Sequence, residues 1–172
     1  MPKNAKDFTG ENDNILALGT PGGGKTSLFT TIPGKKFLYI LDPNSLQTIK
    51  GQDIDYEIFL PEEIDISAVT LRTGVRDEPI EAQSVKTYLK FEEHFEEALR
   101  DNFFETYDTI GIDGMTSLQD ITMDRIQKLN GRFGKHPEYA DNTATMATVR
   151  KIIRTAASLN IRVFIAAHTD RK

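Results

Sequence analysis

The sequence contains no cysteine, which excludes disulfide bonds and thiolate metal sites. Long hydrophobic runs are also missing, and the longest one, around residues 163–167, is too short to cross a bilayer. The N-terminal stretch MPKNAKDFTGENDN lacks the apolar core of a signal peptide. From these absences we expect a cytoplasmic protein with no membrane partner.

The 172 residues are enough for one domain with a real core. Apolar residues make up 38% and charged residues 27%, values typical of a globular protein. The sequence shows no internal repeat and no low-complexity tract. We therefore expect a short N-terminal tail over residues 1–13 and a single core over residues 14–172.

Charge is unevenly distributed along the chain, whose total is −5. Residues 132–172 contain eight basic and three acidic side chains, a net charge of +5, so the preceding residues carry −10. A basic face on an acidic protein is compatible with steering a polyanion to one side. Ordinary solvated helix charge explains the pattern equally well.

Short apolar runs alternate with helical patterns. Residues 15–18, 37–41, 110–112 and 161–167 have the composition of buried parallel strands. The segments YEIFL (56–60) and AVTLR (68–72) could be further strands. Together with the helices below, these runs predict an α/β fold with a mostly parallel sheet flanked by helices.

Three longer helices are expected between the strands. Apolar spacing predicts one over residues 81–104. Thr116 and Gln119 fit a capping box that opens the second. The third carries Met146 to Leu159, with Asn142 or Thr143 as its cap. The polar stretch between the last two, residues 131–145, is predicted to be an exposed loop.

The stretch GTPGGGKT matches the phosphate-binding pattern G-x-x-x-x-G-K-[ST] at every required position. It follows an apolar run and precedes a segment that can be helical, as the mechanism requires. Glycines let the backbone turn its N–H groups toward a phosphate. The pattern predicts that nucleotide is bound by Gly19, Thr20, Pro21, Gly22, Gly23, Gly24, Lys25, Thr26 and Ser27. In this scheme Lys25 reaches the β- and γ-phosphates of ATP, and the Thr26 hydroxyl takes one site on Mg²⁺.

Polar residues at the ends of the other apolar runs are candidates for the rest of the site. Asp113 ends YDTIGID and could hold Mg²⁺, or be a turn residue before Gly114. Asp42 could orient or deprotonate an attacking water, although LDPN is also a turn signal. His168 ends the last run and could contact the γ-phosphate. We therefore predict Lys25, Asp42, Asp113 and His168 as catalytic residues, and Thr26 and Asp113 as metal ligands.

In order and spacing, the segments GTPGGGKT, FLYILDPN, YDTIGIDGMTSL and VRKIIRTAASLNIRVFIAAH resemble RecA-like P-loop ATPases. The similarity extends over residues 14–172 and is strongest to the phage branch with short RecA-like single-strand annealing proteins. The resemblance implies ATP hydrolysis and assembly on single-stranded DNA during phage-type recombination or annealing. It also implies a homo-oligomer whose subunits complete each other's nucleotide sites, and host cytoplasm as the location. The same resemblance implies that the loop bearing Arg132, Phe133 and Lys135 faces DNA, although an ordinary solvated loop explains these residues equally well. Arg171 and Lys172 could begin a second such loop, or be a charged tail.

Two features depart from that family. Gly114 rather than glutamate follows Asp113, so a water-activating carboxylate must come from elsewhere, with Asp42 as the candidate. The sequence also stops at HTDRK, where a RecA-like core continues, which indicates a minimal or C-terminally truncated version. Two other functions remain open: a nucleotide-gated adaptor for a DNA replication or packaging partner, and a small-molecule or nucleoside kinase.

Overall fold

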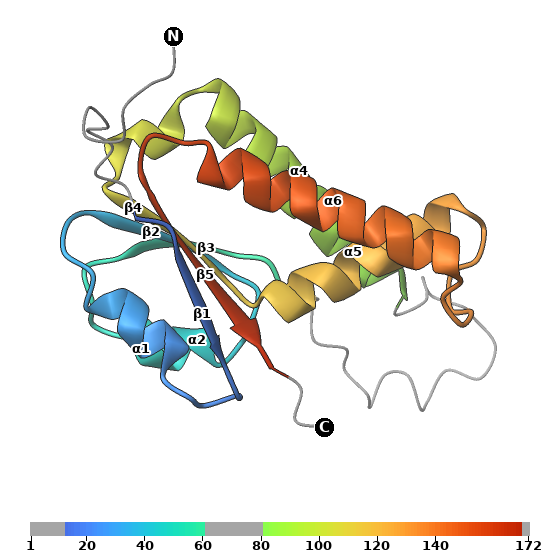
Figure 1. The fold of residues 1–172 in the computed structure, drawn as a ribbon, viewed down its shortest axis with the longest axis horizontal. Coiled ribbons are helices and arrows are strands. Elements are labelled where there is room, and N and C mark those ends of the chain that lie inside the picture. The colour runs from blue at the N-terminus through green and yellow to red at the C-terminus, as the bar shows by residue number, and fades with distance from the viewer. Residues whose placement is uncertain (1–12, 61–80, 170–172) are drawn as a thin grey trace, which may run out of the picture.

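The computed structural model of the chain describes residues 13–60 and 81–169. Within these residues, a five-stranded parallel sheet has the order β1-β5-β4-β2-β3 (Figure 1). Its strands are β1 (Ile15–Gly19), β2 (Lys36–Ile40), β3 (Asp55–Ile58), β4 (Thr109–Asp113) and β5 (Arg162–His168). The four strands expected at residues 15–18, 37–41, 110–112 and 161–167 are thereby confirmed.

Helices cover both faces of the sheet (Figure 1). On one face lie α1 (Lys25–Thr30) and α2 (Ser45–Ile49). On the other lie α4 (Glu81–Arg100), α5 (Met115–Leu129) and α6 (Tyr139–Ala157), and a 3₁₀ turn, η2 (Phe103–Thr106), connects α4 to β4. The expected α/β fold is therefore correct. None of the described helices combines the length and apolar character needed to span a membrane.

Successive side chains of each strand point to opposite faces of the sheet, so each face has its own hydrophobic core. In β2, Phe37 and Tyr39 pack with α4, whereas Leu38 and Ile40 belong to the cluster under α1 and α2. Gly111 in β4 faces this second cluster, where a Cβ atom would lie 2.5 Å from Leu38 Cδ1. The missing side chain allows α1 to pack closely on the sheet, and α1 is the helix that follows the glycine loop.

Among the less certain segments, YEIFL contributes β3, which begins and ends slightly earlier than expected. The segment AVTLR (68–72) lies outside the described residues. The helix predicted over residues 81–104 ends at Arg100, because Asn102 adopts a left-handed conformation with φ of 54° before η2 begins.

The predicted capping box of Thr116 and Gln119 is wrong. α5 begins at Met115, and its N-cap is Gly114, with φ of 106° and no side-chain cap. A Cβ atom on Gly114 would lie 2.8 Å from the carbonyl carbon of Leu41. Close approach of two chain segments therefore sets the start of α5, and only glycine fits there.

The predicted exposed loop over residues 131–145 is also wrong in its second half, because α6 begins at Tyr139. Its cap is Glu138 rather than Asn142 or Thr143, and Glu138 forms a reciprocal capping box with the buried Asp141. Backbone N–H of Glu138, the Asn130 amide and the Arg132 guanidinium lower the pKa of Asp141. An ionised carboxylate thus ties the start of α6 to the end of α5.

Candidate nucleotide-binding site

A cavity of about 390 Å³ opens at the carboxyl edge of the sheet, where parallel strands place their ligands. The cavity collects the ends of β2, β4 and β5 around the glycine loop. It is lined by Pro21, Gly22, Gly23, Gly24, Lys25, Thr26, Ser27, Asp42, Asn44, Ser45, Thr48, Asp113 and His168. The structure therefore brings together every predicted catalytic residue and residues 21–27 of the predicted nucleotide loop.

The glycine loop takes a conformation that other residues rarely adopt. Gly22 and Gly24 have φ of 73° and 79°, and a Cβ atom on Gly23 would lie 2.9 Å from the Thr20 carbonyl oxygen. The Gly23 N–H donates to that same oxygen at 3.0 Å. Consecutive turns of this kind form backbone concavities that bind anions. Gly19 and Thr20, which do not line the cavity, present their carbonyl oxygens to Lys25.

The Lys25 ammonium is buried and fully occupied. It donates to the Gly19 carbonyl at 3.1 Å, to the Thr20 carbonyl at 3.0 Å, and contacts His168 Nδ1 at 3.1 Å. An ammonium has three N–H donors and no acceptor. The contact with His168 therefore requires an unprotonated Nδ1, and the ring proton must lie on Nε2.

The other side of the His168 ring meets Asp42, with 3.1 Å between Nε2 and Oδ2. The second Asp42 oxygen accepts the backbone N–H and the side-chain amide of Asn44, each at 3.0 Å. Burial acts to raise the pKa of Asp42, but these hydrogen bonds from Asn44 and His168 outweigh it and lower the pKa. Asp42 is thus an ionised carboxylate that fixes the tautomer of His168.

Asp113 sits at the end of β4 and is 3% exposed. Its Oδ2 accepts the Thr26 hydroxyl at 2.5 Å and the Ser45 hydroxyl at 2.7 Å. One carboxylate beside one hydroxyl is the sparse oxygen set that suits Mg²⁺, which takes its remaining ligands from water and phosphate. No group of three or more His, Cys, Asp or Glu side chains able to hold a metal by itself occurs in the described parts of the chain. The donor set at Thr26 and Asp113 therefore fits a magnesium ion that arrives with a nucleotide.

Ser45 and Asn44 are site residues that the sequence analysis missed. Both follow Asp42 in the segment LDPNS, whose composition indicates only a turn. Ser45 is 2% exposed and begins α2, and its contact with Asp113 joins residues 68 positions apart. No local pattern reports such a contact, although an Asp-x-Asn-Ser run after a buried strand could have suggested polar groups at the same edge.

The residues predicted to contact DNA lie elsewhere. Arg132, Phe133 and Lys135 belong to the connection between α5 and α6, at the end of these helices far from the glycine loop (Figure 1). The Arg132 guanidinium is paired with Glu138 and Asp141, whereas the Lys135 side chain is exposed. Arg171 and Lys172 lie outside the described residues. DNA contact at this connection stays a prediction.

Replacing Ser45 by alanine should weaken magnesium-dependent nucleotide binding. The change leaves Thr26 as the one hydroxyl donor to Asp113 and frees the carboxylate to rotate. Loss of such an outer partner costs about tenfold or more in metal affinity. We expect a corresponding rise in the Mg²⁺ concentration for half-maximal binding of a fluorescent ATP analogue. The exposed Ser158→Ala change should leave that concentration unaltered, and an unaltered value for Ser45→Ala would contradict the assigned role.

Comparison with known proteins agrees with this geometry. Residues 11–172 match the family model described as an AAA domain, a family of P-loop NTPases. No curated protein matches the chain. The match supports the P-loop ATPase part of the resemblance seen in the sequence, and the phage annealing branch stays a prediction. Because the model covers nearly the whole chain, the protein belongs to the AAA domain family of P-loop NTPases.

Proposed function

We propose that the chain binds ATP with Mg²⁺ in the cavity above the glycine loop and hydrolyses it, and that this turnover serves an action on single-stranded DNA. The observation that carries the ATPase part is the contact between Lys25 and His168. A nucleotide phosphate that binds Lys25 must compete with the protein's own acceptors. Binding of ATP is therefore coupled to the state of His168.

Phosphate oxygens are stronger partners for the ammonium than a neutral ring nitrogen, because the hydrogen bond becomes charge-assisted at both ends. When Lys25 turns toward the β- and γ-phosphates, Nδ1 of His168 loses its donor. The ring itself stays in place, because Asp42 holds Nε2 and Asn44 holds Asp42. An unprotonated nitrogen then faces the cavity, beside the group that Lys25 has reached.

His168 supplies the proton acceptor that the residue after Asp113 does not. A water attacks the γ-phosphorus, a new P–O bond forms, and the bond from that phosphorus to the bridging oxygen of ADP breaks. The proton released by the water passes to Nδ1, and the Asp42 carboxylate stabilises the imidazolium. Asp42 therefore acts as a positioning residue through His168 rather than as the base itself.

Mg²⁺, when bound, neutralises the developing charge on the phosphate oxygens. Thr26 and Asp113 would hold it, with Ser45 orienting the carboxylate. Lys25 binds the phosphates and leaves His168 free. Each residue predicted as catalytic thus receives a separate task in one reaction.

One observation keeps a second function open, a nucleotide-gated adaptor that binds ATP without turnover. Gly114 occupies the position after Asp113, and both Asp42 oxygens are already hydrogen-bonded. If His168 does not accept the proton, the remaining carboxylate that lines the cavity is Asp113, which would hold Mg²⁺. Measuring the release of phosphate from ATP, as described next, separates the two functions.

Substitution of His168 by alanine should reduce ATP turnover by about 100-fold or more while leaving ATP affinity within a few-fold. Asp42→Asn should also slow turnover, because an asparagine amide can donate to Nε2 and push the ring proton onto Nδ1. The measurement is release of phosphate under saturating ATP and Mg²⁺, with Lys25→Ala as the inactive reference. The exposed Asp101→Asn change, at the far end of α4, is the matched control and should keep full turnover.

A turnover rate of the His168→Ala variant within twofold of the wild-type rate would contradict the proton-acceptor role of His168. Binding of ATP with no turnover in the wild-type chain would favour the adaptor.

The DNA part of the proposal rests on charge and on the resemblance to annealing proteins. Residues 132–172 carry a net charge of +5 on an otherwise acidic chain. Lys135 is exposed two residues after the half-buried Phe133, and a cation and an aromatic ring in one connection suit phosphate contact and base stacking. In this proposal several copies of the chain assemble on one strand.

Binding to a fluorescent oligodeoxythymidine should weaken steeply as salt is raised, because phosphate contacts release counterions. The slope of log affinity against log salt should fall by about 0.7 in Lys135→Ala. Phe133→Ala should weaken binding with little change of slope. Lys50→Ala, an exposed cation near α2, is the control. An affinity for the oligodeoxythymidine that does not change with salt concentration, or no binding at low salt, would contradict the DNA part of the proposal. Neither result would bear on the ATPase part.

A further inference from the structure

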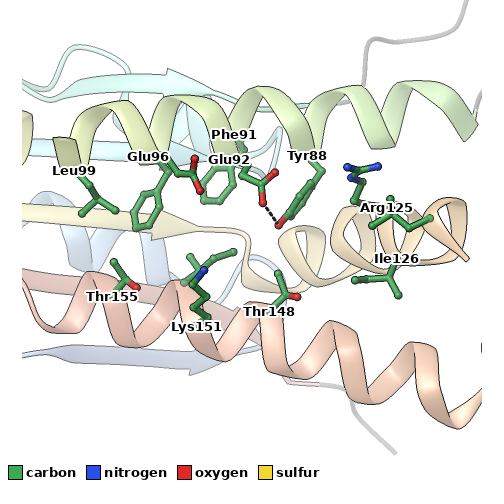
Figure 2. A pocket seen from close by; sticks show the side chains of 13 residues that line it. Tyr88, Phe91, Glu92, Glu96, Leu99, Arg125, Ile126, Thr148, Lys151 and Thr155 are labelled. Carbon is green, nitrogen blue, oxygen red and sulfur yellow. Dashed lines mark hydrogen bonds between the residues drawn. The ribbon is translucent and has the colours of Figure 1, made fainter. Parts of the chain in front are cut away.

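A second cavity, of about 450 Å³, lies between α4 and α6, with the end of α5 as its third side (Figure 2). It shares no lining residue with the nucleotide cavity. Its apolar surface comes from the three helices together: Phe91, Phe95, Leu99, Ile126, Leu129 and Ile152. Leu129 is 63% exposed, although it belongs to this apolar set. An apolar groove of this kind gains stability when a partner removes it from water.

The two long sides of the groove carry opposite charge. We call Glu92 and Glu96 of α4, which line the groove, together with the exposed Glu93, the acidic ridge. We call Lys151 of α6, which lines the groove, together with the exposed Arg154, the basic ridge. Arg125 of α5 also lines the groove. Figure 2 shows Glu92 and Glu96 on one side of the groove and Lys151 on the other. No ion pair between the two ridges occurs in the described part of the chain. Most of these side chains are exposed, so their charges face solvent across an apolar groove.

We propose that this face is an interface between two copies of the chain. The charges decide how the copies would sit. If the two-fold axis lay in the interface plane and crossed the groove at right angles, the acidic ridges of the two copies would face each other. A two-fold axis running along the groove places the acidic ridge of each copy over the basic ridge of the other. The second arrangement makes two equivalent attractive contacts, as an isologous dimer requires.

The occupant is therefore a second copy because the chain carries its own complement. A partner of uniform charge would be attracted to one ridge and repelled by the other. In a dimer of this face, each ridge meets a ridge of opposite charge. Charge pairs at the rim steer and orient the association, and the apolar groove between them supplies the area removed from water. The groove is remote from Lys25, so this dimer forms without nucleotide.

A charge-swap experiment tests the interface. The first variant, Glu93→Lys with Glu96→Lys, makes both ridges basic and keeps Glu92, which accepts the Tyr88 hydroxyl. The second, Lys151→Glu with Arg154→Glu, makes both ridges acidic. Each variant alone should lose self-association, with a dimer dissociation constant raised about tenfold or more. An equimolar mixture should restore a dimer, because every ridge then faces its opposite.

Sedimentation velocity without nucleotide gives the readout, with unchanged thermal unfolding as proof that each variant is folded. The matched control, Asp53→Lys with Glu57→Lys, changes the net charge as the first variant does but lies near β3, and should dimerise like the wild type. A wild-type chain that stays monomeric at high concentration overturns the proposal. So does a mixture that remains monomeric, or a dimer that both variants retain.

Discussion

The site depends on one group, the Lys25 ammonium, and on the three hydrogen bonds that it makes. They join the end of β1, the start of the glycine loop and the end of β5 at a buried position. Because an ammonium only donates, this contact fixes which nitrogen of His168 carries the proton. That choice in turn gives Asp42 its role, since Nε2–H needs an ionised acceptor. A single cation thus sets the chemistry of His168, which lies 143 positions away in the sequence, and through it that of Asp42.

The sheet makes this arrangement possible. β5 lies between β1 and β4, so His168 lies between the lysine of the glycine loop and the Asp113 that ends β4. On the other side of β4, β2 delivers Asp42 and the α2 segment with Ser45. Parallel strands end at one edge, which is why four distant segments meet in one cavity. The tight packing at Gly111 and Gly114 lets α1 and the β2–α2 connection come close enough to that edge.

Much of this could be predicted from the sequence because its signals are local. Buried strands are short apolar runs, and the glycine loop is an eight-residue pattern with a stated mechanism, so Lys25, Thr26 and Asp113 were found. The starts of α5 and α6 were not, because tertiary contact decides them: Gly114 begins α5 where Leu41 passes close by, and Glu138 caps α6 through Asp141. Ser45 could not be predicted for the same reason, since its hydrogen-bond partner, Asp113, lies in β4. The pairing of Arg132 with Glu138 and Asp141 is likewise visible only in three dimensions.

In the proposed function, Lys25 exchanges its protein acceptors for nucleotide phosphates. Calorimetric titration of ATP with Mg²⁺ into the wild-type chain and into Lys25→Met tests it most directly, because methionine keeps the length of the side chain and removes only the donors. We expect one binding event in the wild type and a loss of at least about 100-fold in affinity in the variant, because a buried charge-assisted contact disappears. Equal affinity in the two proteins would contradict it.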